Sequence, residues 1–236
     1  MVRINKYLSE MGVCSRRKAD VLIDNGQVYI NNRLATKGSQ IDPAVDVVSV
    51  EGKKINKGKE DLEYWVLHKP KGYISTTCDE KGRKSVIDLI KSRKRLYPVG
   101  RLDADSSGLI ILTNDGEFAN KLMHPSHNHE KRYLVRAKYF RKNSNGWIKS
   151  KFEGGILVEG TNMKAEKVYS IENISPQEIQ IDLTLVTGYN RQIRKMCDKI
   201  GLGVVSLKRT KIAKLDLNKL ALKSGESKQI LKEDIL

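Results

Sequence analysis

The stretch VGRLDADSSGLIILT, residues 99–113, places a loop of reactive side chains directly before an apolar strand. The loop contains two carboxylates, Asp103 and Asp105, with an arginine, two serines and two glycines. The four consecutive aliphatic residues 109–112 are typical of a strand that is buried on both faces. Such a strand holds the preceding loop still, which favours a catalytic use of its carboxylates. From this stretch alone, an ordinary solvent-exposed turn without a catalytic role is equally consistent with the sequence.

The composition indicates a globular protein that binds a polyanion. The 236-residue chain is 39% hydrophobic and carries a formal net charge of +16. Its lysines and arginines run through the whole length, and both the first 60 residues and the remainder are net basic. Each phosphate that such a surface neutralises releases counterions, so RNA or DNA is the expected partner. The length allows one large domain, or a small one followed by a medium one.

The cysteines and the hydropathy pattern bear on the expected location. Cys14, Cys78 and Cys197 are far apart and form no CxxC pair, which predicts a reducing compartment without disulfides or a zinc site. No apolar run approaches the roughly 18 residues of a membrane span, and the N-terminus has no signal-peptide pattern. We therefore expect a cytoplasmic protein that makes no membrane contact.

The first 58 residues predict two short helices followed by a small sheet. Apolar residues recur at helical spacing in 4–11 and again in 19–23, with Ser15 as the expected N-cap of the second helix. That helix begins with three cations, residues 16–18, which oppose the helix dipole and so suggest a phosphate partner. Strands are expected at 27–31 and 45–50.

This order of elements, with the text RINKYL (3–8), CSRRKAD (14–20) and GQVYIN (26–31), resembles the S4 RNA-binding module. We expect an S4 domain at 1–58, a lysine- and glycine-rich linker at 52–61 and a second domain at 62–236. The resemblance implies RNA contacts for one set of residues in the first domain: Arg3, Lys6, Ser15, Arg16 and Arg17.

The second domain reads as β-rich with a few helices. The pattern predicts strands at 64–68, 73–77, 130–137, 180–186 and 204–212, and helices that begin near Glu117 and after Gly188. The expected helix that follows Gly188 lines Arg191, Arg194 and Lys195 along one side.

A metal site is an alternative function for the loop that carries Asp103 and Asp105. The carboxylates Asp103, Asp105 and Asp115 precede three histidines, His124, His127 and His129, which together suggest a metal-dependent nuclease. The histidines lie in a loop without helical or strand spacing, so the pattern gives this reading little support. The sequence predicts no bound metal.

Three motifs in order resemble the RsuA/RluB/RluE/RluF family of rRNA pseudouridine synthases. They are GRLD with SGLIILTNDG (100–103 and 107–116), KRYLV (131–135) and NRQIRKMC (190–197). Stretches similar to the RluF type are ISTT (74–77), HEK (129–131) and LKRTKI (207–212). The implied fold class is α+β: a small S4 domain followed by a catalytic domain with a mainly antiparallel mixed sheet.

The resemblance also implies roles for individual residues. Asp103 is the essential carboxylate, Tyr133 stacks on the target uracil, and Arg194 pairs with Asp103. Leu207 packs against the base, and Arg101 lies in the substrate pocket. Phosphate contacts are implied for Arg101, Lys131, Arg191 and Arg209. Whether Asp103 is a nucleophile or the base that removes the C2′ proton stays open.

The implied enzyme works as a monomer without a cofactor. Its expected substrate is a uridine in bacterial 23S rRNA near the peptidyl-transferase centre, with 16S rRNA or tRNA as alternatives. A non-catalytic S4-type RNA-binding or ribosome assembly factor is the other function that the sequence allows.

Overall fold

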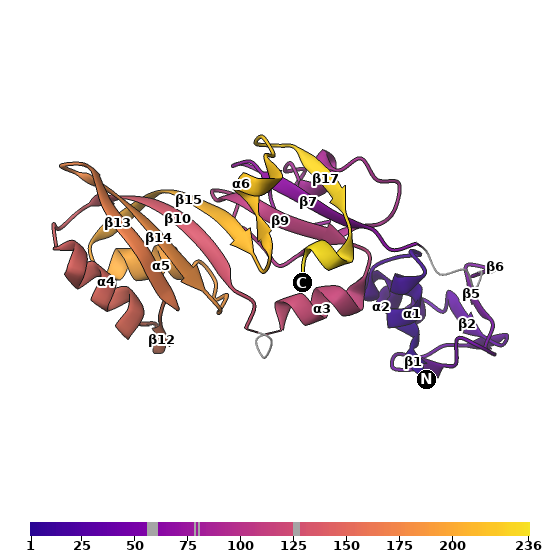
Figure 1. Cartoon of the computed structure of the whole chain (residues 1–236). Coiled ribbons are helices and arrows are strands. Elements are labelled where there is room, and N and C mark those ends of the chain that lie inside the picture. The colour runs from indigo at the N-terminus through magenta and orange to yellow at the C-terminus, as the bar shows by residue number, and fades with distance from the viewer. Residues whose placement is uncertain (56–60, 78, 80, 125–127) are drawn as a thin grey trace. The chain divides into compact units, whose positions relative to one another are not determined.

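The computed structural model describes residues 1–55, 61–77, 79, 81–124 and 128–236 (Figure 1). The chain divides into two compact units. The first contains residues 1–62, 92–95 and 114–116, and the second contains 63–91, 96–113 and 117–236. The expected linker at 52–61 includes residues 56–60, which lie outside the described residues. Its first part forms a short strand.

The first unit has the two helices and the small sheet that the sequence predicts. Ser15 caps the second helix, because its Oγ accepts a hydrogen bond from the Lys18 amide at 3.1 Å. The apolar faces of both helices meet in one core with residues from the strands, among them Leu8, Ile23 and Ile41. The elements are β1 (Val2–Arg3), α1 (Ile4–Glu10), α2 (Arg16–Asp24), β2 (Val28–Ile30), β3 (Arg33–Leu34), β4 (Gln40–Ile41), β5 (Val48–Val50) and β6 (Lys53–Lys54).

The second unit is built on one mixed sheet. Among the described residues nine strands join it, in the order β13-β14-β10-β15-β9-β7-β17, with β16 beside β15 and β8 beside β9. Its strands are β7 (Tyr64–Lys69), β8 (Tyr97–Val99), β9 (Ser107–Thr113), β10 (Lys131–Tyr139), β13 (Lys167–Ser175), β14 (Glu178–Leu185), β15 (Leu202–Ile212), β16 (Leu215–Asp216) and β17 (Ser227–Ile230).

Helices and a small hairpin complete this unit (Figure 1). The helices are α3 (Gly116–Met123), α4 (Asn145–Gly154), α5 (Gln192–Lys199) and α6 (Leu217–Leu220), with the short 3-10 helices η1 (Val86–Leu89) and η3 (Lys232–Asp234). The hairpin pairs β11 (Ile156–Val158) with β12 (Thr161–Met163). Within the part of the chain that is described, no helix combines the length and apolarity needed to cross a bilayer.

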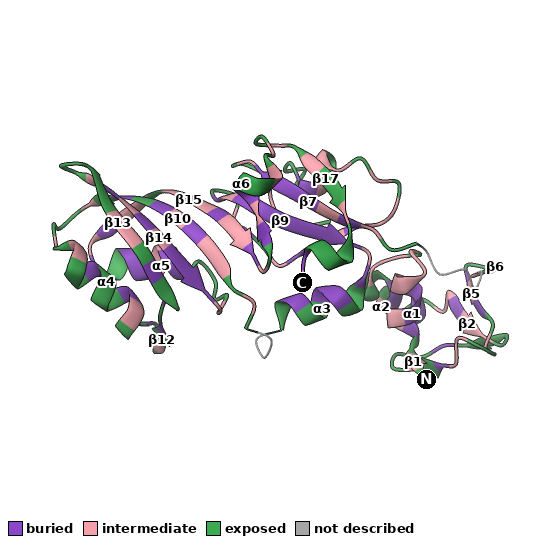
Figure 2. Cartoon of the chain, in the orientation of Figure 1, coloured by how far each residue is buried: buried purple, intermediate pink, exposed green. Residues whose placement is uncertain are grey.

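Strand β9 is buried on both faces, as its aliphatic run predicts (Figure 2). Alternate residues of a strand point to opposite faces of the sheet. Accordingly Ile110 and Leu112 join the core that contains α4 and α5, while Leu109 and Ile111 join the core that contains α3. The loop that precedes β9 is therefore attached to the most buried strand of the unit.

The sheet is mainly antiparallel, with one parallel pairing between β15 and β9. In that pairing Lys208 lies opposite Ser107, and Arg209 lies opposite Gly108. The backbones approach so closely that a Cβ at Gly108 would lie 2.2 Å from the Arg209 carbonyl oxygen. Gly108 also has φ +113°, a conformation that glycine adopts far more readily than other residues. This glycine therefore allows two halves of the sheet to join.

The structure differs from the expected elements at residues 73–77. The sequence predicts a strand there, but the described residues form only an isolated bridge between Ile74 and Ser85. In this segment the Ser75 side chain bonds to Leu102 of the loop before β9. The local pattern of β-branched residues does not reveal this use of the segment.

Candidate active site

The loop that carries Asp103 is held by hydrogen bonds to its own backbone. Each of the five consecutive carbonyls of residues 102–106 accepts a hydrogen bond from a donor outside the loop. The pairs are Leu102 O with Ser75 Oγ (2.8 Å), Asp103 O with Lys69 Nζ (3.1 Å), Ala104 O with the Gly72 amide (2.7 Å), Asp105 O with Arg194 Nη2 (3.1 Å) and Ser106 O with Lys69 Nζ (2.7 Å). The backbone around Asp103 is therefore fixed before any substrate binds.

Lys69 is a buried cation at the end of β7 that the sequence reading did not assign to the site. Its Nζ donates to three carbonyls, those of Pro70, Asp103 and Ser106, which uses all three of its N–H groups. Burial lowers the pKa of Lys69 to about 8, although the carboxylates of Asp105 and Asp103 act to raise it. A lysine that follows an apolar strand directly before a proline is the only sequence signal for this role.

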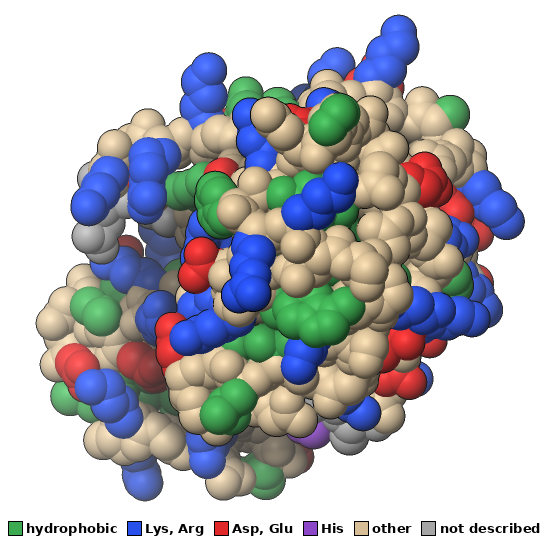
Figure 3. Space-filling model, turned by 90° about the vertical axis from the view of Figure 1, so that its left-hand side faces the viewer, with side chains coloured by type: hydrophobic (Ala, Val, Ile, Leu, Met, Phe, Trp, Pro, Cys, Tyr) green, Lys and Arg blue, Asp and Glu red, His purple; other side chains and the backbone are tan. Residues whose placement is uncertain are grey.

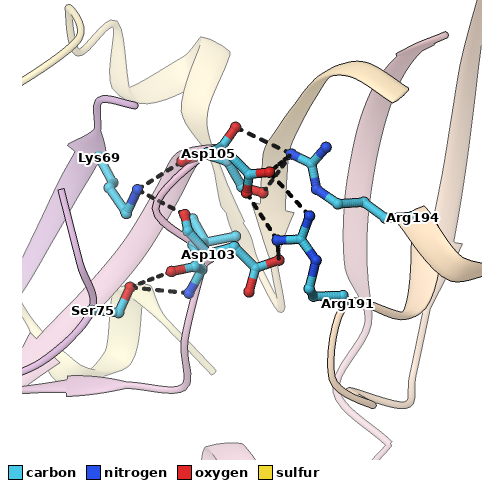
Figure 4. Close-up of polar contacts among 8 residues, drawn as sticks. Lys69, Ser75, Asp103, Asp105, Arg191 and Arg194 are labelled. Carbon is cyan, nitrogen blue, oxygen red and sulfur yellow. Dashed lines mark hydrogen bonds and ion pairs between the residues drawn. The ribbon is translucent and has the colours of Figure 1, made fainter. Parts of the chain in front are cut away.

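Ser75 clamps the residue that precedes Asp103. Its hydroxyl donates to the Leu102 carbonyl and accepts from the Leu102 amide at 3.1 Å. Both backbone groups of Leu102 are thus bound by one side chain (Figure 4). This contact spans 27 residues of sequence and was not predicted.

Two arginines at the start of α5 face the two carboxylates (Figure 4). The Nη1 of Arg191 lies 3.5 Å from Asp103 Oδ2, and its Nη2 lies 3.2 Å from Asp105 Oδ2. The Nη2 of Arg194 lies 3.2 Å from Asp105 Oδ2 and also contacts Ser106 Oγ at 3.3 Å. The expected pairing is therefore wrong in detail: Arg194 pairs with Asp105, and Arg191 is the arginine beside Asp103.

The two carboxylates differ in their surroundings. Burial acts to raise the pKa of Asp105, but the hydrogen bond from Arg191 and the charge of Arg194 outweigh it and hold that pKa below its usual value. Among the described residues, the Asp103 carboxylate has one ion-pair contact, the longer one to Arg191, and it lines a pocket of about 460 Å³. Asp105 is thus engaged by two arginines, whereas Asp103 is open to a ligand.

The pocket brings together residues from four places in the chain. Arg101, predicted from the sequence, lines it, as does Arg191. The other lining residues are Ile74, Ser75, Thr76, Asp79, Arg83, Leu102, Asp103 and Ala104. The pocket therefore combines one available carboxylate with several cations.

Tyr133 and Leu207 lie in the core of the sheet and do not line this pocket. They are 8% and 6% exposed, on the adjacent strands β10 and β15. The register places Tyr133 opposite Arg209, which in turn lies opposite Gly108 of β9. Both side chains are thus close in register to the end of β9 at which the Asp103 loop enters.

Two of the predicted phosphate contacts occupy unexpected positions. Arg209 is only 3% exposed, and its Nε donates to the Leu109 carbonyl at 2.8 Å. Through its Nε this arginine bonds to the backbone of the sheet, and its contact with an RNA phosphate stays a prediction. Lys131 is partly buried, and burial together with the nearby charge of Arg209 lowers its pKa. Its Nζ donates to the His129 carbonyl at 3.1 Å.

The residues of the first unit that are predicted to contact RNA lie at or near its surface. Arg3, Arg16 and Arg17 are exposed, and Ser15 is used as the helix cap. Lys6 forms an ion pair with Glu10 at 3.4 Å within α1. The cations at the start of α2 are thus available to an external anion.

The metal alternative gains no support from the described residues. His127 lies outside them. Across residues 1–55, 61–77, 79, 81–124 and 128–236, no three His, Cys, Asp or Glu side chains converge in a way that would hold a metal ion.

Comparisons with known proteins identify the family. A model of RNA pseudouridylate synthase matches residues 63–199, and one of the S4 domain matches residues 2–47. The chain is 41% identical over 236 residues to the dual-specificity RNA pseudouridine synthase RluF of Escherichia coli K12, a match that covers 100% of this chain and 77% of that protein. It is 40% identical over 238 residues to ribosomal large subunit pseudouridine synthase B of Bacillus subtilis, covering 100% and 94%.

A solved structure of a pseudouridylate synthase agrees with this result. It superposes with a TM-score of 0.66 at 26% identity, covering 100% of this chain and 98% of that one. The α+β fold with its large mixed sheet and the motif order lead to the same family. The chain belongs to the RNA pseudouridine synthases and carries an S4 RNA-binding domain at its N-terminus.

Proposed function

We propose that the substrate is a uridine of large-subunit ribosomal RNA near the peptidyl-transferase centre, and that Asp103 is the carboxylate that acts on it. The observation that carries this proposal is Asp103 itself, which lines the pocket on a loop whose five carbonyls are all bonded. The Bacillus subtilis relative is named for the large ribosomal subunit, which supports this class of substrate.

The reaction is an isomerisation within one nucleotide. The N1–C1′ bond of the uridine breaks, the uracil turns, and a C5–C1′ bond forms while the C5 proton is lost and N1 regains one. This requires a carboxylate at the ribose and a base removed from its stack. Asp103 acts as the nucleophile at C1′ or as the base at C2′. The guanidinium of Arg191 lies 3.5 Å from this carboxylate.

The remaining predicted residues support binding of the nucleotide. We propose that Tyr133 and Leu207 contact the base from the adjacent strands β10 and β15, where they lie close in register to the entry of β9. Arg194 acts through Asp105, whose carboxylate it holds. The proposed role of Arg194 is therefore to position the loop that carries Asp103.

The charge of the molecule suits an RNA substrate. Figure 3 shows lysine and arginine side chains spread widely over one face, with acidic side chains among them. The net charge of +16 and the exposed cations at the start of α2 supply attraction to phosphates that is independent of sequence. The residues that line the pocket belong to one unit of one chain, so we propose a monomer that acts on rRNA in the cytoplasm.

Pseudouridine mapping tests the substrate. In a strain that lacks this protein, we expect one pseudouridine of 23S rRNA to disappear, as read by carbodiimide modification and primer extension. The wild-type gene should restore it, and a gene encoding Asp103→Asn should not. A complete 23S rRNA profile in that strain would contradict the proposal.

Transfer RNA is the second candidate substrate. The Escherichia coli relative is named a dual-specificity enzyme, which favours a second class of RNA. The same mapping extended to tRNA and 16S rRNA separates these cases, because each predicts a different lost modification.

Loss of the Ser75 hydroxyl is expected to slow catalysis without weakening RNA binding. Ser75→Ala frees both backbone groups of Leu102, so Asp103 loses its fixed position, and kcat should fall by about 10- to 100-fold at an unchanged KM. Ser75→Thr keeps the hydroxyl and should restore most of kcat.

Ser227→Ala is the matched control, because Ser227 Oγ also donates to a backbone carbonyl, that of Leu89 at 2.9 Å, away from the pocket. It should leave kcat as in the wild type. Equal losses in Ser75→Ala and Ser227→Ala would show that Ser75 has no special role in positioning Asp103.

A further inference from the structure

The pocket of Asp103 contains an arginine, Arg83, to which neither the motifs nor the family resemblance assigned a role. Arg83 and Asp79 lie in the segment between β7 and η1 and line the pocket together with Arg101 and Arg191. The pocket thus has three arginines and two carboxylates on its walls. One of these carboxylates, Asp103, has to stay available for the reaction.

The carboxylate of Asp79 accepts hydrogen bonds from one edge of the Arg83 guanidinium. The Nε of Arg83 lies 3.2 Å from Oδ1 and 3.1 Å from Oδ2 of Asp79, and its Nη2 lies 2.6 Å from Oδ1. The Arg83 amide also donates to Asp79 Oδ2 at 2.8 Å. These hydrogen bonds from Arg83 lower the pKa of Asp79 to about 2, so its carboxylate is ionised at every pH at which the enzyme would be assayed.

The two members of this pair are unequally exposed. The side chain of Asp79 is 9% exposed, whereas that of Arg83 is 58% exposed. The guanidinium uses its Nε and Nη2 toward Asp79, and no bond to Nη1 is formed by any residue in the described part of the chain. A planar guanidinium that donates to a carboxylate along one edge can donate to a phosphate oxygen from its other edge.

Arg101 supplies a second cation on the wall formed by the Asp103 loop. It is exposed, and within the described residues it takes part in no hydrogen bond or ion pair. Arg191, by contrast, is engaged by Asp103 and Asp105. The positive charge that is left for an incoming anion therefore comes from Arg83 and Arg101.

We propose that Arg83, oriented by Asp79, forms with Arg101 a phosphodiester subsite for the backbone of the nucleotide that enters the pocket. The proposal rests on the assignment of Asp103 as the reactive carboxylate. A nucleotide that leaves its stack needs its flanking phosphate fixed, since phosphate contacts set the position of the strand. Asp79 is a positioning residue here, because it acts through Arg83.

Kinetics at several salt concentrations test the subsite. Arg83→Gln removes one phosphate contact, so KM for the RNA should rise about 10-fold, with kcat at saturating RNA changed by less than about twofold. The slope of log KM against log salt should fall by about 0.7 to 0.9, as expected for one lost contact. Arg101→Gln, which breaks no bond within the protein, should lower the slope by the same amount.

Arg136→Gln is the matched control. Arg136 lies on β10 and forms the same kind of one-edge pair, with Nε and Nη2 at 2.7 Å and 2.6 Å from Glu178 Oε2, and its side chain is 50% exposed. It does not line the pocket. This variant should keep the wild-type KM and salt slope. If Arg83→Gln matches Arg136→Gln in both quantities, the subsite is refuted.

Equilibrium binding separates this proposal from the assignment of Asp103. The RNA affinity of Asp103→Asn and of the double variant Asp103→Asn with Arg83→Gln is measured without turnover. An approximately 10-fold weaker affinity of the double variant supports the subsite. Equal affinities overturn the subsite and leave the assignment of Asp103 unchanged, whereas full activity of Asp103→Asn overturns the assignment on which the subsite rests.

Discussion

Asp103→Asn is expected to lower pseudouridine formation by at least about 10⁴-fold, because removal of a group that reacts with the substrate costs several orders of magnitude. The side chain keeps its size, and its loop keeps the hydrogen bonds to all five carbonyls, since those bonds involve backbone oxygens. RNA binding should therefore remain. Release of tritium from RNA labelled at uracil C5 measures the reaction.

Asp105→Asn is the informative comparison. It removes a carboxylate from the same loop, but Asp105 is bound to Arg191 and Arg194 and does not line the pocket. We expect a loss of about 10-fold or less, of the size found for groups that only orient others. Tritium release by Asp103→Asn at the wild-type rate, or equal losses in both variants, would contradict the role given to Asp103.

Gly108→Ala is expected to destabilise the second unit by about 3 kcal/mol or more. The new Cβ would lie 2.2 Å from the carbonyl oxygen and 2.5 Å from the amide nitrogen of Arg209. Both are backbone atoms, so the clash is relieved only if β9 and β15 separate. Because the Asp103 loop enters β9 at this point, activity should fall with stability.

Urea unfolding followed by tryptophan fluorescence measures this effect. Both tryptophans of the chain, Trp65 and Trp147, belong to the second unit, so the signal reports on that unit. Gly225→Ala is the control, since Gly225 has φ +91° with nothing within 4 Å of an added Cβ. It should cost only the backbone strain, about 1 kcal/mol. Equal unfolding midpoints for the two variants would show that the close approach of β9 and β15 does not contribute to the free energy of unfolding.

The sequence by itself determined the features that depend on neighbouring residues. The aliphatic run 109–112 predicted a strand buried on both faces, because such a strand keeps successive aliphatic side chains from water. Helical spacing and a serine cap determined α2 in the same way. The motif around Asp103 predicts that this carboxylate reacts. The order of the motifs indicated the family, which the comparisons confirm.

Only the tertiary structure decided which distant groups meet. Arg191 and Arg194 are three residues apart at the start of α5, so both reach the loop, and the orientation of that helix decides that Arg191 lies beside Asp103. The sequence predicts Arg209 as a phosphate contact, yet the structure buries it on β15, opposite Gly108 of β9. Lys69 bonds to Ser106 across 37 residues. Such contacts depend on how the strands are ordered in the sheet, and local patterns of side chains carry no record of that order.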